Sequence, residues 1–187
     1  SIIALINPSW GFGVPLLPIH LLWINLVTDS LPAFGIAMEE IDNEVMDLKP
    51  RGKNESFFSN GLGLKIAIEG FIIGTCSLAS YIIGHFIFKN EEVAQTMAFL
   101  TLSSTQLFHA YNVKSNHTIF RKESFKNKFM NFAFIVGFIL QFFVIYCPQV
   151  NTIFNLSPLS IIQLFISLFL ALVIVIIIEI SKRTRAK

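Results

Sequence analysis

Three polar side chains interrupt an apolar stretch near the start of the chain. Asn25, Thr28 and Asp29 lie within the run Leu21–Pro32, which is otherwise almost wholly apolar. Positions i, i+3 and i+4 share one face of an α-helix, so their side-chain oxygens are expected to converge. Pro32 has no N–H, which is predicted to leave the carbonyl of Thr28 unbonded and to break the helix between Thr28 and Pro32. Carboxylate, amide, hydroxyl and carbonyl oxygens are the ligands that Ca²⁺ and similar hard cations prefer.

A cation-binding role would explain why a carboxylate stands in so apolar a segment. An Asp near the centre of a bilayer costs at least ~2.5 kcal/mol, which makes function the default hypothesis. The alternative is that a partner neutralises Asp29 and the residue only locks helices together. A second polar run, Ser103–Gln106, has two readings as well. Its side chains could hydrogen-bond between helices, or Gln106 could offer its carbonyl oxygen to the same cation.

The composition places these residues in a membrane protein. Of the 187 residues, 53% are hydrophobic and only 14% are charged, and the mean hydropathy is +0.65. A soluble domain carries about 25% charged residues. With ~20 residues for each crossing, five spans are predicted, at about 16–38, 62–88, 93–111, 129–147 and 159–180. The expected fold is an all-α polytopic bundle in the lipid bilayer, since the runs are too long and continuous for barrel strands.

The basic residues predict the orientation of this bundle. All but one of the 14 Lys and Arg fall in or beside the segments 39–61 and 112–128 or after residue 180: Lys49, Arg51, Lys53, Lys65, Lys114, Arg121, Lys122, Lys126, Lys128, Lys182, Arg183, Arg185 and Lys187. Cytoplasmic loops carry the excess of Lys and Arg. We therefore expect both segments and the C-terminus in the cytoplasm. The links 89–92 and 148–158, and the residues near Trp10–Pro15, are expected outside.

Several smaller features are predicted to serve packing. Lys65 and Glu69 stand one helical turn apart and are expected to form an ion pair. Gly70 and Gly74 form a small-xxx-small pattern that lets another helix approach closely. Cys76 and Cys147 are expected to be unpaired. The sequence holds no glycine-rich phosphate loop, nucleophile–base set or zinc-type cluster, and no nucleic-acid partner is expected.

At this level of detail the sequence resembles a known family. Leu22–Ala33 looks like the sixth membrane helix of calcium-transporting P-type ATPases, and Asp42–Arg51 resembles the loop that follows that helix. Thr96–Asn112 is similar to their eighth helix. The apolar start, Ile2–Ile6, is too short to span a membrane and reads as the end of their fifth helix. The resemblance implies that the chain is the C-terminal transmembrane domain of a longer pump.

This resemblance carries expectations for individual residues. Asn25, Thr28 and Asp29 fall on the family's ion-coordinating Asn, Thr and Asp, with Asp29 as the central ligand. Sodium–potassium pumps carry an Asp where this chain has Asn25, which favours calcium. A Glu of the eighth helix that completes the second site of two-ion pumps appears here as Gln106, which favours one Ca²⁺ per cycle. The segment 39–61 would be a cytoplasmic coupling loop.

The resemblance also implies what lies outside this chain. Ca²⁺ takes six to eight oxygens, and the family draws the remainder from its fourth and fifth helices. Mg²⁺ and ATP would act in cytoplasmic phosphorylation and nucleotide domains of the same pump. The parent would be a multi-pass enzyme of the cell membrane that exports Ca²⁺ from the cytoplasm. Three alternatives stay open: a pump for another cation such as Mn²⁺, a five-span carrier or channel that is not an ATPase, and a structural bundle without transport.

Overall fold

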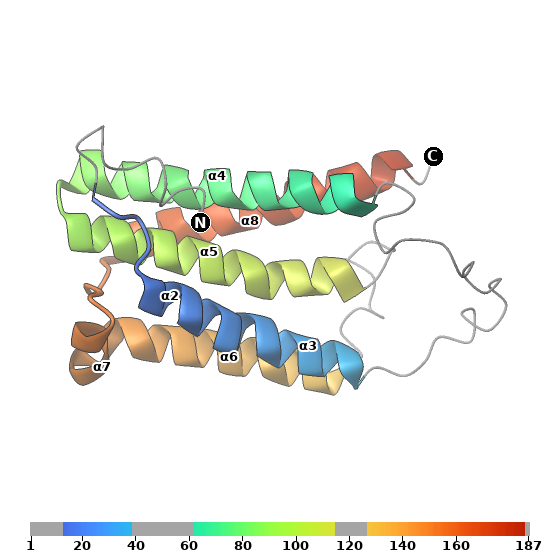
Figure 1. Ribbon diagram of the computed structural model, residues 1–187, viewed down its shortest axis with the longest axis horizontal. Helices are drawn as coiled ribbons and strands as arrows, with labels where there is room; N and C mark the ends of the chain where they lie inside the picture. Colours follow the sequence, from blue (N-terminus) through green and yellow to red (C-terminus); the bar gives the residue numbers. More distant parts are fainter. Residues whose placement is uncertain (1–12, 39–61, 115–126, 186–187) are drawn as a thin grey trace, which may run out of the picture.

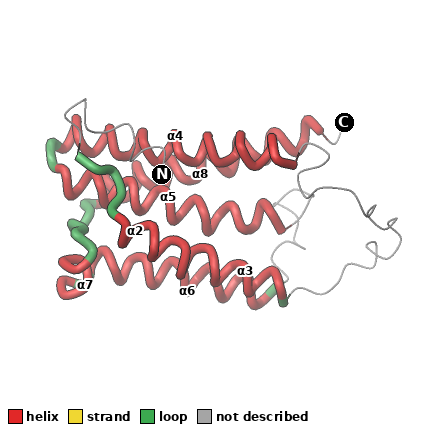
Figure 2. Tube along the Cα trace, in the orientation of Figure 1, coloured by secondary structure: helices red, strands yellow, loops and turns green. Residues whose placement is uncertain are grey.

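A computed structural model describes residues 13–38, 62–114 and 127–185 of the chain. Every regular element in these ranges is a helix (Figure 2). In chain order they are α2 (Pro18–Trp23), the π-helix η1 (Ile24–Asp29), α3 (Ser30–Ala37), α4 (Leu62–Phe88), α5 (Glu91–Lys114), α6 (Lys128–Tyr146), α7 (Pro148–Ile153) and α8 (Ile161–Arg185). The prediction of an all-α bundle is confirmed.

Four stretches of the described chain are long and apolar enough to cross a membrane. They are Pro18–Ala37, which runs through α2, η1 and α3, then Gly63–Phe88, Lys128–Tyr146 and Ile161–Glu179. Each coincides with an expected span. The remaining expected span, 93–111, lies in α5, which has 24 residues and is thus ~36 Å long. Its length suffices for a crossing, but it carries more polar residues than the other four.

α5 occupies the centre of the bundle, which accounts for its composition. It packs against α4, α8, α6 and η1, and Figure 1 shows it between the α4–α8 pair and the α3–α6 pair. Its residues Ala94, Met97, Phe99 and Leu107 are completely buried. A helix covered by protein does not need a lipid-like surface, because neighbouring helices can satisfy its polar groups.

The polar side chains of α5 join it to α4 and α8. The Thr101 hydroxyl donates to Ser80 Oγ at 2.8 Å and lies 3.3 Å from the carbonyl oxygen of Ser167. Ser77 Oγ on α4 donates to the carbonyl of Ala98 at 3.1 Å. All three hydroxyl groups are buried. Within the polar run 103–106, the hydroxyl of Ser103 accepts a hydrogen bond from the amide of Gln141 on α6. This bond agrees with the interpretation that the run joins helices.

The long helices begin and end at two opposite ends of the bundle (Figure 1). The end that carries α7, here called the α7 end, also holds the start of α2 and the α4–α5 turn. His20 Nε2 lies 2.6 Å from the carbonyl oxygen of Phe154 there. At the other end, Asn127 Nδ2 donates to the carbonyl of Gly35 at 2.8 Å. This grouping agrees with the predicted alternation of the links, whereas the side that faces the cytoplasm stays a prediction. The expected coupling loop, 39–61, lies outside the described residues.

Two packing predictions are confirmed. Lys65 Nζ lies 3.9 Å from Glu69 Oε1, and the other oxygen of Glu69 is 3.6 Å from His109 Nε2 on α5. Cys76 and Cys147 are free.

The close approach expected at Gly70 and Gly74 is not made by the described helices. A Cβ atom at either position would meet nothing within 4 Å. Gly84 of α4 does make a close contact, because it lies against the backbone of Ala94.

Candidate cation site

The helix that carries Asn25 and Asp29 changes its winding where these residues occur. η1 spans Ile24–Asp29, between two ordinary α-helical segments. The sequence predicts a break between Thr28 and Pro32. The irregular stretch overlaps that range but begins four residues earlier, and the chain remains helical throughout. Pro32 is buried as the third residue of α3, directly after η1, and it has no N–H to donate to the turn before it. Single π-helical turns inside α-helices occur frequently at functional sites.

The structure separates the three expected ligands into two groups. Asn25 and Asp29 are exposed, whereas Thr28 is buried, with 1% of its surface accessible. The hydroxyl of Thr28 donates to the carbonyl of Ile24 at 2.7 Å. The one-face prediction assumed 3.6 residues per turn, and a π-helix winds more slowly than that. Asn25 and Asp29 therefore lie on the uncovered side of the helix, and Thr28 faces the protein.

Ser30 contacts the same turn, and the sequence pattern does not single it out. Its hydroxyl donates to the carbonyl oxygen of Asn25 at 3.1 Å. Side-chain hydroxyls thus serve two consecutive carbonyls of η1, those of Ile24 and Asn25. In the sequence, the one feature that could point to Ser30 is its position five residues after Asn25. Five residues is the i→i+5 spacing of hydrogen bonds in a π-helix. Such bonds stabilise a turn in which the regular i→i+4 pattern is lost.

Gln106 is half-buried on α5. Within the described ranges, no hydrogen bond joins its side chain to η1, and its role as a further ligand stays a prediction. The same ranges contain no group of three or more His, Cys, Asp and Glu side chains placed to hold a metal. Within η1 itself, Asp29 is the one carboxylate that a cation could use.

Comparison with known proteins decides the family. Residues 13–184 match the model for the family described as "Cation transporting ATPase, C-terminus". This chain belongs to that family. It is 38% identical over 143 residues to a calcium-transporting ATPase of Bacillus subtilis, an alignment that covers 76% of this chain and 16% of the relative. It is 33% identical over 189 residues to calcium-transporting ATPase 1 of Bacillus cereus, with 92% of this chain and 21% of the relative covered.

The similarity extends to a fungal protein. An endoplasmic reticulum calcium ATPase of Aspergillus fumigatus is 26% identical over 187 residues, with 83% of this chain and 19% of that protein covered. The chain spans about a fifth of the length of the curated relatives that it matches. As the C-terminal part of a cation-transporting ATPase, it is a multi-pass membrane protein, and its matched region takes in the whole of α2, η1 and α3.

Proposed function

We propose that this chain is the membrane domain of an ATP-driven pump that exports Ca²⁺ from the cytoplasm, with Asp29 as the central ion ligand. One observation carries the proposal. Within a segment of 20 residues that is apolar enough to span a membrane, a π-helical turn presents Asn25 and Asp29 on an uncovered side. In a member of the cation-transporting ATPase family, a carboxylate so placed is suited to the cation.

The exposed side of η1 supports the idea that further ligands come from elsewhere in the pump. Asn25 and Asp29 supply fewer than the six to eight oxygens that Ca²⁺ takes. An exposed carboxylate in the membrane is costly unless it is covered by protein or water. Both needs are met if other helices of the full-length pump lie against this side and add oxygens of their own. ATP and Mg²⁺ would act in its cytoplasmic domains, which would reach the membrane domain through segment 39–61.

Thr28 has a smaller expected share in ion binding. To turn its hydroxyl to the exposed side, it would have to give up the 2.7 Å bond to the carbonyl of Ile24. We therefore assign Thr28 mainly to the shape of η1.

A second cation, Mn²⁺, is the nearest competitor, because oxygen ligands alone do not choose between these ions. No observation favours a carrier or channel without ATPase activity.

The test is phosphorylation of the full-length protein by radiolabelled ATP. Labelling is titrated with Ca²⁺, Mn²⁺ and Na⁺ in wild type, Asp29→Asn and Thr28→Val. We expect labelling of wild type to require Ca²⁺ and to be lost in Asp29→Asn. Thr28→Val should label fully at a Ca²⁺ requirement raised by less than about tenfold, which corresponds to ~1.4 kcal/mol. The matched control is Thr75→Val on the exposed side of α4, where the hydroxyl bonds only within its own helix.

Labelling of wild type that is indifferent to Ca²⁺ would refute the calcium assignment. If Asp29→Asn were labelled at the same Ca²⁺ concentration as wild type, Asp29 would not be an ion ligand. It would then serve only helix packing. A requirement met only by Mn²⁺ would transfer the proposal to that cation.

A further inference from the structure

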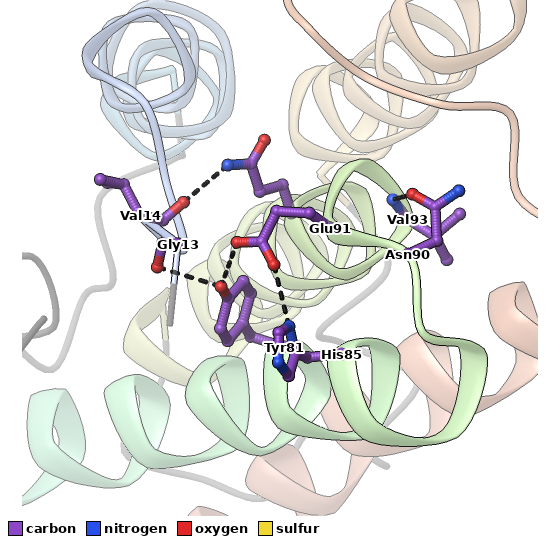
Figure 3. Close-up of polar contacts among 8 residues, drawn as sticks. Gly13, Val14, Tyr81, His85, Asn90, Glu91 and Val93 are labelled. Atoms are coloured by element: carbon purple, nitrogen blue, oxygen red, sulfur yellow. Dashed lines mark hydrogen bonds and ion pairs between the residues drawn. The ribbon is translucent and has the colours of Figure 1, made fainter. Parts of the chain in front are cut away.

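The segment that leads into α2 is held by side chains of α4 and α5. At the α7 end, the hydroxyl of Tyr81 lies 3.0 Å from the carbonyl oxygen of Gly13. Gln95 Nε2 donates to the carbonyl of Val14 at 2.8 Å. Figure 3 shows both bonds reaching the segment from the same side. Two consecutive carbonyls are therefore fixed to the α4–α5 hairpin, shortly before the helix that carries Asn25 and Asp29 begins.

Glu91 completes this arrangement. Its Oε1 accepts a hydrogen bond from Tyr81, and its Oε2 lies 2.9 Å from Nδ1 of His85 (Figure 3). The carboxylate also fills the space beside Gly13, because a Cβ atom at that position would stand 1.8 Å from Glu91 Oε1. Only a residue without a side chain lets the carboxylate and the segment come this close.

The same contacts continue into the apolar core. Tyr81 is 1% exposed and clusters with Ala94 and Ala98, and Leu16 packs against this cluster. Leu16 is also part of the packing around the larger core that contains Ile24 of η1. Residues 13–17 thus pack against the same core as Ile24, the residue at which η1 begins.

We propose that Tyr81, Glu91 and Gln95 form a clasp that fixes residues 13–17 and thereby positions the cation site. These are positioning residues, because they act through α2 and touch no ion. α2 has only six residues, so it transmits a displacement of its start as a short rigid rod. The π-helical turn that follows is the weakest point of the helix and takes up the displacement, where Asn25 and Asp29 are found. This inference rests on the proposed function.

The hydrogen count predicts how substitutions at Glu91 behave. The hydroxyl of Tyr81 has one hydrogen, yet two acceptors face it, the carbonyl of Gly13 and the carboxylate of Glu91. An amide at position 91 could donate to Tyr81, which would leave the hydroxyl hydrogen for Gly13. Glu91→Gln is therefore expected to keep the clasp closed. Glu91→Ala leaves the Tyr81 hydroxyl hydrogen for Gly13 as well, but it removes the side chain that fills the space beside Gly13, so it is expected to loosen the clasp.

The first experiment measures the Ca²⁺ concentration that half-saturates phosphorylation of the full-length protein by ATP. Tyr81→Phe should raise this concentration by up to about fivefold, the equivalent of one hydrogen bond of ~1 kcal/mol, with maximal labelling unchanged. The matched control is Tyr146→Phe. Tyr146 makes the same kind of bond, to the carbonyl of Leu159 at 3.0 Å, but does not touch residues 13–17, so its loss should leave the Ca²⁺ requirement unchanged.

A double-mutant cycle tests whether Gly13 and Glu91 act as one unit. Gly13→Ala and Glu91→Ala should each raise the Ca²⁺ requirement, and the double variant should be no worse than Glu91→Ala alone, because the new methyl group then has room. Glu91→Gln should stay within twofold of wild type. The clasp would be overturned if the effects of Gly13→Ala and Glu91→Ala on the Ca²⁺ requirement were additive. It would also be overturned if Tyr81→Phe left the Ca²⁺ requirement unchanged, or if Glu91→Gln raised it as much as Glu91→Ala.

Amide hydrogen exchange separates a failed clasp from a failed pump assignment. Tyr81→Phe should speed exchange at Val14, Leu16 and Leu17 in the full-length protein whichever ion is transported, and Tyr146→Phe should not. Unchanged exchange in Tyr81→Phe would refute the clasp directly. Faster exchange combined with phosphorylation indifferent to Ca²⁺ would keep the clasp as a fold element, refute its role in Ca²⁺ binding and refute the calcium assignment.

Discussion

Gly84 and Gly70 lie on the same helix and are predicted to respond in opposite ways to the same substitution. A Cβ atom at Gly84 would stand 2.5 Å from Ala94 Cα and 2.9 Å from its Cβ. The first distance is ~1 Å shorter than the ~3.5 Å at which carbon atoms rest in contact. The obstructing atom belongs to the backbone of α5 and cannot turn away. Gly84→Ala therefore forces α4 and α5 apart.

The magnitude follows from two opposing effects. Overpacking of this kind costs about 1–3 kcal/mol, and exchange of Gly for Ala within a helix returns about 1 kcal/mol. Gly84→Ala should then lower the free energy of unfolding by up to about 2 kcal/mol. Gly70→Ala meets nothing within 4 Å and should raise it by up to about 1 kcal/mol. The two variants should differ by about 1–3 kcal/mol.

The assay is reversible unfolding of the purified chain in mixed micelles with increasing sodium dodecyl sulfate, followed by the circular dichroism of its helices. Adding Ala94→Gly to Gly84→Ala should restore only part of the loss, since it removes the 2.9 Å contact and leaves the 2.5 Å contact. Equal midpoints for Gly84→Ala and Gly70→Ala would refute the packing of α4 on α5 as described.

Three further predictions concern buried polar groups. Ser80→Ala should destabilise the chain by about 1 kcal/mol in the same assay, because it removes the acceptor of the Thr101 hydroxyl and a bond to the carbonyl of Met97; an equal loss in Thr75→Ala, whose hydroxyl bonds only within α4, would contradict this. Gln141→Met should cost less than Gln141→Ala, because Oε1 of this buried amide has no hydrogen-bond partner in the described part of the chain and an apolar side chain of similar volume fills its place; unfolding midpoints in the reverse order would refute it. Glu179→Met should raise the unfolding midpoint, since Glu179 is 4% exposed and neither carboxylate oxygen has a hydrogen-bond partner among the side chains that the structure describes; a lower midpoint would mean that the carboxylate is needed.

The sequence predicted the helices well because hydropathy acts on each span separately. The bounds of α4 agree with the expected span 62–88 residue for residue, since apolar length alone determines such a helix. Position 106 and the hydroxyls before it were harder to interpret. A polar run in a span indicates burial against other helices, but it does not tell which neighbour each hydroxyl meets.

The ligand roles of Asn25, Thr28 and Asp29 stay predictions, and helical periodicity predicted only part of the geometry of this turn. Helical periodicity placed Asn25 and Asp29 together, and it failed for Thr28 because η1 does not wind as an α-helix. No local pattern announces a π-helical turn. The clasp was missed for a different reason: Gly13 and Tyr81 are 68 residues apart, and such a contact depends on how α2 packs against the α4–α5 hairpin.

The central place of α5 has a consequence for how the protein is made. Four stretches are apolar enough to partition into a bilayer by themselves, and α5 is not among them. The hydroxyl of Thr101 finds its partners only once α4 and α8 are beside it. We expect α5 to leave the translocation channel together with α4 as a helical hairpin, joined by the short turn at Lys89 and Asn90. Nascent chains that end before α8 should then hold α5 loosely in the membrane and be prime targets for quality-control proteases.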